Sequence, residues 1–230
     1  IPFTSIQSKT FMKNLRLFVF GLASVAFLAA CDSDKKSADQ HAGHDMTAPD
    51  STQKTASAET SHGGHEHGGA TPATAQDLGE VDIAVKNQIG DLLSVYLDLK
   101  NALVATDDAK AKTVAASLIQ KLGDVDDEKM TEDQKAFFHS LHEKIKTDAE
   151  HITEAGIDHQ REHFSSMSNQ MFKLVKSFQA NQKQVYYDFC PMAFDNKGAY
   201  WLSETEEIKN PYFGEKMMNC GSVKETLAQQ

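Results

Sequence analysis

The residues best suited to chemistry are sulfur side chains near the C-terminus. Cys190-Pro-Met192 is followed by Met217-Met-Asn-Cys220, and the stretch between them holds the only tryptophan of the chain. Thiolate and thioether sulfurs are soft ligands that suit Cu(I), whereas thioether is a poor ligand for Zn(II). Helical spacing favours Met217 over Met218, because Met217 lies one turn before Cys220. The set Cys190, Met192, Met217 and Cys220 therefore predicts a copper site for Cu(I), with Zn(II) or Ag(I) as alternative ions.

The N-terminal region has the features of an export signal. Residues 1–11 show no pattern, and we interpret residues 12–30, from Met12 onward, as a lipoprotein signal peptide. Its apolar run is too short for a membrane-spanning helix, which needs about 20 residues. Leu-Ala-Ala before Cys31 looks like a bacterial lipobox, so we expect lipid on Cys31 and a protein anchored to a membrane in the periplasm or at the cell surface. An ordinary signal peptide with an incidental cysteine is the alternative.

Lipidation of Cys31 would leave Cys190 and Cys220 as a pair in an oxidising compartment. One interpretation is a disulfide that closes a loop of roughly 30 residues and stabilises the fold by a few kcal/mol. The other interpretation is a pair of metal ligands. The spacing of the two cysteines is compatible with either interpretation.

Residues 31–77 read as a disordered tether, because their Ser, Thr, Ala, Gly, Asp and Lys content offers almost no large apolar side chain to bury. Imidazole binds Cu(II), Zn(II) and Ni(II), and flexible spacing lets a chain wrap one ion. We therefore predict weak metal capture by the clustered histidines of this tether, and adventitious binding is the alternative. These histidines are His41, His44, His62, His65 and His67.

Residues 78–230 are predicted to form one all-α domain, an up-down-up-down four-helix bundle with a small irregular Cys/Met/aromatic-rich C-terminal segment. The first helix carries an apolar stripe at alternating steps of four and three residues, from Val85 to Leu103. Thr131 and Gln134 form a capping box for the third helix, and Asp158 is expected to cap the fourth. In the C-terminal segment, Val185–Phe189 and Ala199–Leu202 have the composition of two short strands, which predicts a β-hairpin.

The fourth helix is predicted to have an inner face made of Phe164, Met167, Met171, Leu174 and Phe178. His159 and His163 lie in line with its two methionines. His163 lies at the edge of the apolar face, where it is either a hydrogen-bonded boundary residue or an additional ligand that reaches the sulfur cluster. His159, and His139, His142 and His151 of the third helix, are expected to be solvent or boundary residues.

Charge and motif content exclude some functions. The formal net charge is −10 and no face gathers lysines and arginines, so we expect no nucleic-acid partner. The sequence contains no Gly-rich phosphate loop, nucleophile elbow or helical His-Glu-x-x-His motif, so we predict that the protein is not an enzyme. A redox enzyme based on Cys190 and Cys220 is disfavoured, because the chain lacks a Cys-x-x-Cys motif.

The C-terminal string resembles a known family. Tyr-x-x-Phe-Cys-Pro-Met-Ala, Gly-Ala-Tyr-Trp-Leu-Ser, Asn-Pro-Tyr-Phe-Gly and Met-x-Cys-Gly are similar to an uncharacterised bacterial domain that occurs in small lipoproteins and fused to periplasmic adaptors of copper and silver efflux pumps. The resemblance covers about residues 80–225 and implies a helical domain associated with copper handling. The 230 residues leave no room for the other domains of an adaptor, so we do not expect a direct role in building a pump.

Together these observations predict a membrane-anchored extracytoplasmic lipoprotein that binds Cu(I) for sequestration or delivery. Its expected partners are metal ions, the membrane that holds the lipid and an efflux-pump adaptor. The rival interpretation is an interaction module with a Cys190–Cys220 disulfide and no metal site, which docks on an efflux adaptor or another envelope protein.

Overall fold

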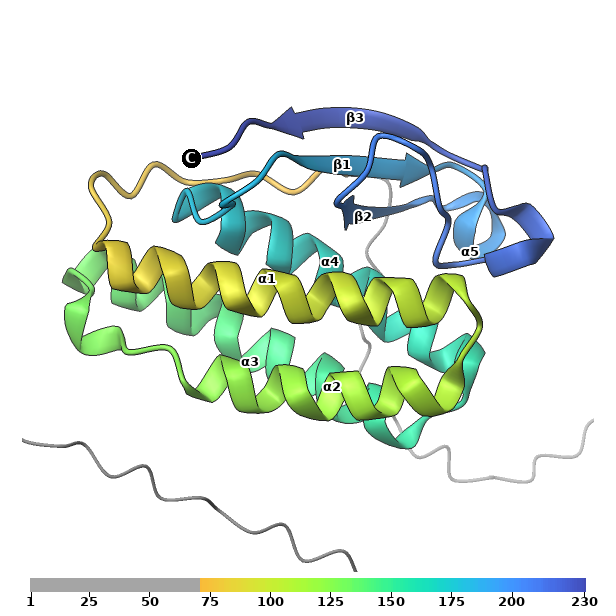
Figure 1. Cartoon of the computed structure of the whole chain (residues 1–230), viewed down its shortest axis with the longest axis horizontal. Coiled ribbons are helices and arrows are strands. Elements are labelled where there is room, and N and C mark those ends of the chain that lie inside the picture. The colour runs from red at the N-terminus through yellow and green to blue at the C-terminus, as the bar shows by residue number, and fades with distance from the viewer. Residues whose placement is uncertain (1–70) are drawn as a thin grey trace, which may run out of the picture. The chain divides into compact units, whose positions relative to one another are not determined.

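The structure, a computed structural model, describes residues 71–230, and these are mostly helical. Four long helices come first, followed by a small three-stranded antiparallel sheet (Figure 1). The helices are α1 (Ile83–Val104), α2 (Asp108–Gly123), α3 (Glu132–Glu154) and α4 (Ile157–Ser177), with the short 3-10 turn η1 (Asp127–Lys129) before α3. The C-terminal part contains β1 (Val185–Cys190), α5 (Ala193–Asn196), β2 (Ala199–Ser203), η2 (Gly214–Met217) and β3 (Ser222–Leu227).

Each long helix packs on the next one in sequence, and α1 also contacts α4. The stripe predicted on α1 is fully buried, including Ile89, Leu92 and Tyr96. On α4 the predicted inner residues are equally buried: Phe164, Met167, Met171, Leu174 and the following Phe178. Burial of these side chains is the main favourable term that holds the helices together.

The starts of the four long helices follow local capping rules with one exception. Thr131 and Gln134 form the predicted capping box at α3, and Asp107 caps α2 by accepting from the Lys110 N–H. The prediction for α4 was wrong, because Gly156 occupies its N-cap without a side-chain bond and Asp158 lies inside the first turn. In the first turn, the Asp158 carboxylate still stabilises the helix through its interaction with the backbone dipole.

The sheet has the order β2-β1-β3. The predicted hairpin is confirmed, since β1 pairs antiparallel with β2 and Cys190 lies opposite Ala199. The prediction missed β3, which pairs with the other side of β1 and has a register shift at Tyr187/Asp188. The segment is therefore more regular than the sequence indicated.

The sheet packs on the helices mainly through contacts of β2 with α4 and α1. Tyr96 of α1 joins the layers, because its hydroxyl lies 2.7 Å from Ser168 Oγ of α4 and accepts from the Leu202 N–H of β2 at 3.1 Å. Contacts with this body begin before residue 78, since the Gln76 N–H donates to Ser177 Oγ at 2.8 Å.

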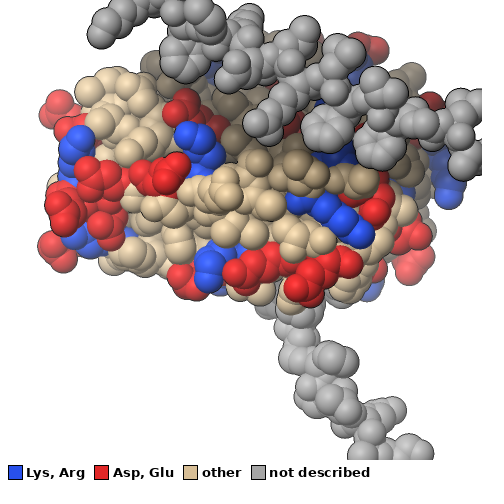
Figure 2. All heavy atoms as spheres, turned by 60° about the horizontal axis from the view of Figure 1, so that its bottom comes forward, with Lys and Arg blue, Asp and Glu red and all other residues tan. Residues whose placement is uncertain are grey.

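On the surface, acidic and basic side chains are interspersed over the face drawn in Figure 2, without a continuous basic patch there. None of the helices within residues 71–230 is both long enough and apolar enough to cross a membrane.

Candidate functional site

The structure brings two of the predicted sulfur ligands together. The Sγ atoms of Cys190 and Cys220 lie 2.9 Å apart, as free thiols, although 30 residues separate them in the sequence. A disulfide needs about 2.05 Å between the sulfurs, whereas two thiolates about 2.3 Å from one ion stand roughly 3.8 Å apart. The pair lies between these two distances, so a small movement of either side chain would bring the sulfurs to the separation found in a disulfide or to that of two ligands of one ion.

Cys190 is fixed by the end of β1 and by an unusual turn after it. The connection from β1 to β2 has left-handed backbone angles at Phe194, Asp195 and Asn196, with φ of 50°, 56° and 65°, and at Gly198, with φ of 78°. A Cβ atom on Gly198 would lie 2.4 Å from the Phe189 ring, so only glycine fits there. This tight turn places Cys190 against β2, where Cys190 has no exposed surface.

Asn210 fixes the other half of the pair. This buried side chain donates to the Cys220 carbonyl at 2.7 Å and accepts from the Tyr212 N–H at 2.8 Å. Its backbone N–H donates to the Met218 carbonyl at 2.8 Å, which closes the loop before Cys220. The sequence alone did not reveal that Asn210 holds Cys220.

Arg161 of α4 anchors the same loop to the helices. Its Nε donates to the Pro211 carbonyl at 2.9 Å, and its Nη2 donates to Thr106 Oγ1 at 3.1 Å. Because the guanidinium is buried, these bonds hold the loop in one position relative to α4. Sequence reasoning missed this residue, since an arginine on a polar helix gives no sign of its partner.

The methionines border the thiol pair. Met192 follows Cys190 and is 48% exposed, and its backbone N–H forms a hydrogen bond with the Cys220 thiol. The Met217 carbonyl accepts from the Cys220 N–H at 3.1 Å, and the Met217 side chain is partly buried. Both methionines therefore lie in the two loops that carry the cysteines.

The surroundings of the pair disfavour charge. Burial, with a further contribution from Cys190, raises the pKa of the Cys220 thiol to about 11. Burial also raises the pKa of Asp188 in β1 to about 7, although the charge of Lys100 opposes this shift. Metal binding as a thiolate would thus have to displace a firmly held proton from Cys220.

His163 is buried and faces α3. It lies 3.0 Å from Asp148 through Nδ1 and 3.1 Å from His151 through Nε2, and His159 of its own helix lies 3.2 Å from Nε2. These bonds place it among residues of α3 and α4, and none of them joins it to the four sulfur residues. Cys31 and the histidines of the predicted tether lie outside the described residues: His41, His44, His62, His65 and His67.

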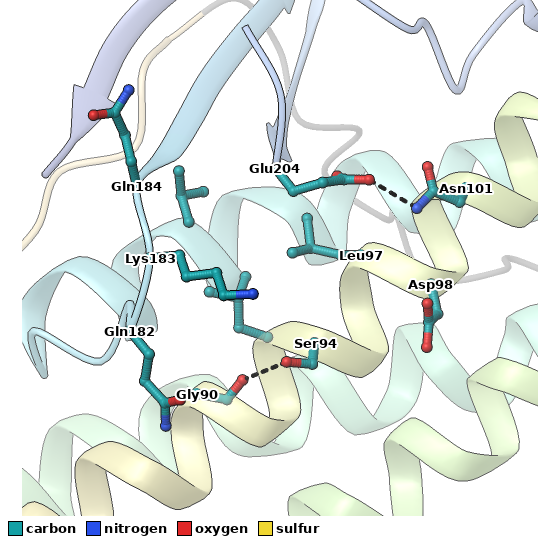
Figure 3. A pocket seen from close by; sticks show the side chains of 11 residues that line it. Gly90, Ser94, Leu97, Asp98, Asn101, Gln182, Lys183, Gln184 and Glu204 are labelled. Carbon is teal, nitrogen blue, oxygen red and sulfur yellow. Dashed lines mark hydrogen bonds between the residues drawn. The ribbon is translucent and has the colours of Figure 1, made fainter. Parts of the chain in front are cut away.

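A separate surface groove lies between α1 and the segment before β1 (Figure 3). Glu204, after β2, points across it and accepts from the Asn101 amide at 2.9 Å and from the buried Lys100 ammonium at 2.6 Å. These contacts attach the end of β2 to α1, so the residues at this edge of the groove help to hold the sheet on the helices.

Comparison with known proteins gives one match. Residues 92–183 are similar to a family described as a protein of unknown function (DUF3347). The matched segment begins within α1 and ends before β1. It includes His151, His159 and His163 and leaves out Cys190 and Cys220. No curated protein and no solved structure matches the chain.

Proposed function

We propose that this protein is an extracytoplasmic lipoprotein that binds Cu(I) through Cys190 and Cys220 and sequesters or delivers it without catalysing a reaction. The observation that carries the proposal is the 2.9 Å between the two sulfurs, with Met192 and Met217 in the adjoining loops. Two thiols with neighbouring thioethers form a donor set that suits Cu(I), and Ag(I) or Zn(II) would be weaker candidates.

The remaining parts have supporting roles in this proposal. Cys31 carries the lipid, and the five tether histidines collect ions loosely near the membrane in the periplasm or at the cell surface. The four helices form an up-down-up-down bundle that holds the sulfur site, and an efflux-pump adaptor is the partner that receives the ion. Nucleic acid is not among the partners, in keeping with the net charge of −10.

The same distance supports a second candidate. A disulfide between Cys190 and Cys220 would make the C-terminal segment a stapled interaction module that docks on an adaptor or envelope protein. A redox enzyme fits less well, because the raised pKa of the Cys220 thiol leaves little reactive thiolate at neutral pH.

The test is a Cu(I) titration of the reduced full chain in detergent, without oxygen and against a competing chelator. The five tether histidines are replaced by asparagine in every sample, so that binding reports on the folded part. Cys190→Ser and Met192→Leu remove proposed ligands, and Met218→Leu is the matched control. Parallel titrations with Ag(I) and Zn(II) establish which ion the site prefers.

We expect one tightly bound Cu(I) per chain, lost in Cys190→Ser, weakened in Met192→Leu and unchanged in Met218→Leu. Mass spectrometry of the protein as purified reports whether the two cysteines are bridged. A reduced protein that binds no more Cu(I) than Cys190→Ser would contradict the copper proposal, and a bridge found with it would favour the interaction module.

A further inference from the structure

Three imidazoles meet where α3 turns into α4. His163 Nε2 lies 3.1 Å from His151 Nδ1 and 3.2 Å from His159 Nε2. The ring centroids of His163 and its two neighbours are 4.4 Å and 4.7 Å apart, with the rings edge to face. Three ring nitrogens, contributed by two helices, therefore converge on one small region.

Carboxylates fix the orientation of two of these rings. Asp148 Oδ1 lies 3.0 Å from His163 Nδ1, and Glu162 Oε2 lies 2.7 Å from His159 Nδ1. With Nδ1 directed at a carboxylate, Nε2 is the ring nitrogen through which the neutral imidazole would bind an ion. Both Nε2 atoms face the same region as His151. A carboxylate behind the imidazole is the usual outer partner of a metal-binding histidine.

We infer that His151, His159 and His163 form a binding site for a borderline divalent transition-metal ion, with Zn(II) as its reference ion. Asp148 and Glu162 are positioning residues that set the tautomers of His163 and His159. Neutral imidazole suits Zn(II), and three histidines leave a fourth position for water. This site uses other residues than the sulfur site and does not depend on it.

The distances agree with this assignment. Nitrogens that share one ion at about 2.0–2.1 Å in tetrahedral geometry stand roughly 3.3 Å apart, close to the separations found. As the side chains are placed within residues 71–230, no group of three or more His, Cys, Asp or Glu could hold a metal ion, so the rings must rotate to admit one. His159 is 61% exposed and His151 half-buried, which gives the ion a path from solvent.

Burial of Asp148 supports the same conclusion. Its side chain is 7% exposed, and within residues 71–230 its Oδ2 atom is buried without a hydrogen-bond partner. A buried carboxylate is costly unless positive charge lies near it. An ion bound to His163 would supply that charge through the imidazole.

The experiment is a Zn(II) titration of the full chain in detergent against a competing chelator. All samples carry asparagine at the five tether histidines and Cys190→Ser, so that neither the tether nor the thiol pair contributes. His151→Gln and His159→Gln each remove one ligand, and Glu162→Gln removes an outer partner on the exposed side. His139→Gln, on α3 and outside the cluster, is the matched control.

We expect one Zn(II) per chain and a dissociation constant at least tenfold weaker in His151→Gln and His159→Gln. Glu162→Gln should weaken binding by about 10-fold or more, in the range typical of outer partners, and His139→Gln should leave it unchanged. Co(II), used as a spectroscopic probe, should give the strong visible absorption of a tetrahedral site in the parent alone. Circular dichroism checks that each variant keeps its helices.

Two results would overturn the inference. The first is a parent protein that binds Zn(II) no better than the His159→Gln variant. Because His159 is exposed, unfolding of the variant would not explain that result. The second is equal loss of binding in His139→Gln, which would show that surface histidines bind the ion without a defined site.

Discussion

The Sγ atoms of Cys190 and Cys220 lie 2.9 Å apart, although the two residues are 30 positions apart in the sequence. One sulfur is held by the end of a strand and the other by a loop that Asn210 closes. The C-terminal segment thus brings two soft donors together through its own hydrogen bonds.

The first prediction concerns oxidation of this pair. Formation of a disulfide should raise the free energy of unfolding by about 3–4 kcal/mol, because it closes a loop of about 30 residues in the unfolded chain. Urea unfolding of the oxidised and reduced protein measures the difference, and oxidation should also abolish Cu(I) binding. Cys190→Ser should unfold identically with and without reductant. Equal stability of the two forms of the parent would contradict the expectation.

The second prediction concerns Asn210. Replacement by alanine removes the bonds to the Cys220 carbonyl and the Tyr212 N–H, and leaves these groups without that partner. We expect a loss of about 1–3 kcal/mol in the free energy of unfolding and Cu(I) binding that is weaker by about tenfold. Asn219→Ala, at an exposed position of the same loop, is the control and should change neither. Unchanged Cu(I) affinity in Asn210→Ala would show that this clamp does not position Cys220.

The third prediction concerns pH. The pKa of Asp188 is raised to about 7 by burial, whereas an unfolded aspartate titrates near about 3.9. Between these values the folded protein holds a proton that the unfolded chain has released, so the free energy of unfolding falls as pH rises from 5 to 7. The slope is at most about 1.4 kcal/mol per pH unit. The charged and titratable groups around Asp188 are Lys100, Glu204 and Tyr96.

Asp188→Asn should remove this slope, because the amide does not titrate. Urea unfolding of the reduced, metal-free protein at pH 5, 6 and 7 measures it. Asp91→Asn, an exposed position on α1, should keep the slope of the parent. A parent whose stability rises over this interval would mean that Asp188 is already ionised at pH 5.

The fourth prediction concerns Gly198. Alanine there would need a left-handed φ of 78° and would place its Cβ 2.4 Å from the Phe189 ring. Backbone strain and displacement of the ring should lower the free energy of unfolding by about 1–3 kcal/mol each. Gly123→Ala, where no atom lies within 4 Å of the added Cβ, should be neutral or slightly stabilising. Thermal unfolding compares the two, and equal midpoints would contradict the prediction.

Much of the fold follows from local patterns in the sequence. The apolar stripe of α1, the inner face of α4 and the capping box at Thr131 were predicted, because each depends on residues within a few turns of one another. The two strands of the hairpin were also predicted from composition. The strand Ser222–Leu227 was not, because it is an edge strand with little apolar signal, and its side chains up to Thr226 alternate between exposed and half-buried.

The candidate sites divide in the same way. The sequence by itself determined which residues carry soft donor atoms, because only cysteine and methionine side chains contain sulfur. It did not determine that Asn210 and Arg161 hold the cysteine loop, nor that His163 meets His151 and His159. Those relationships join segments far apart in the chain or on different helices. Only the tertiary structure decides them, because they depend on how whole elements pack and not on the period of any one of them.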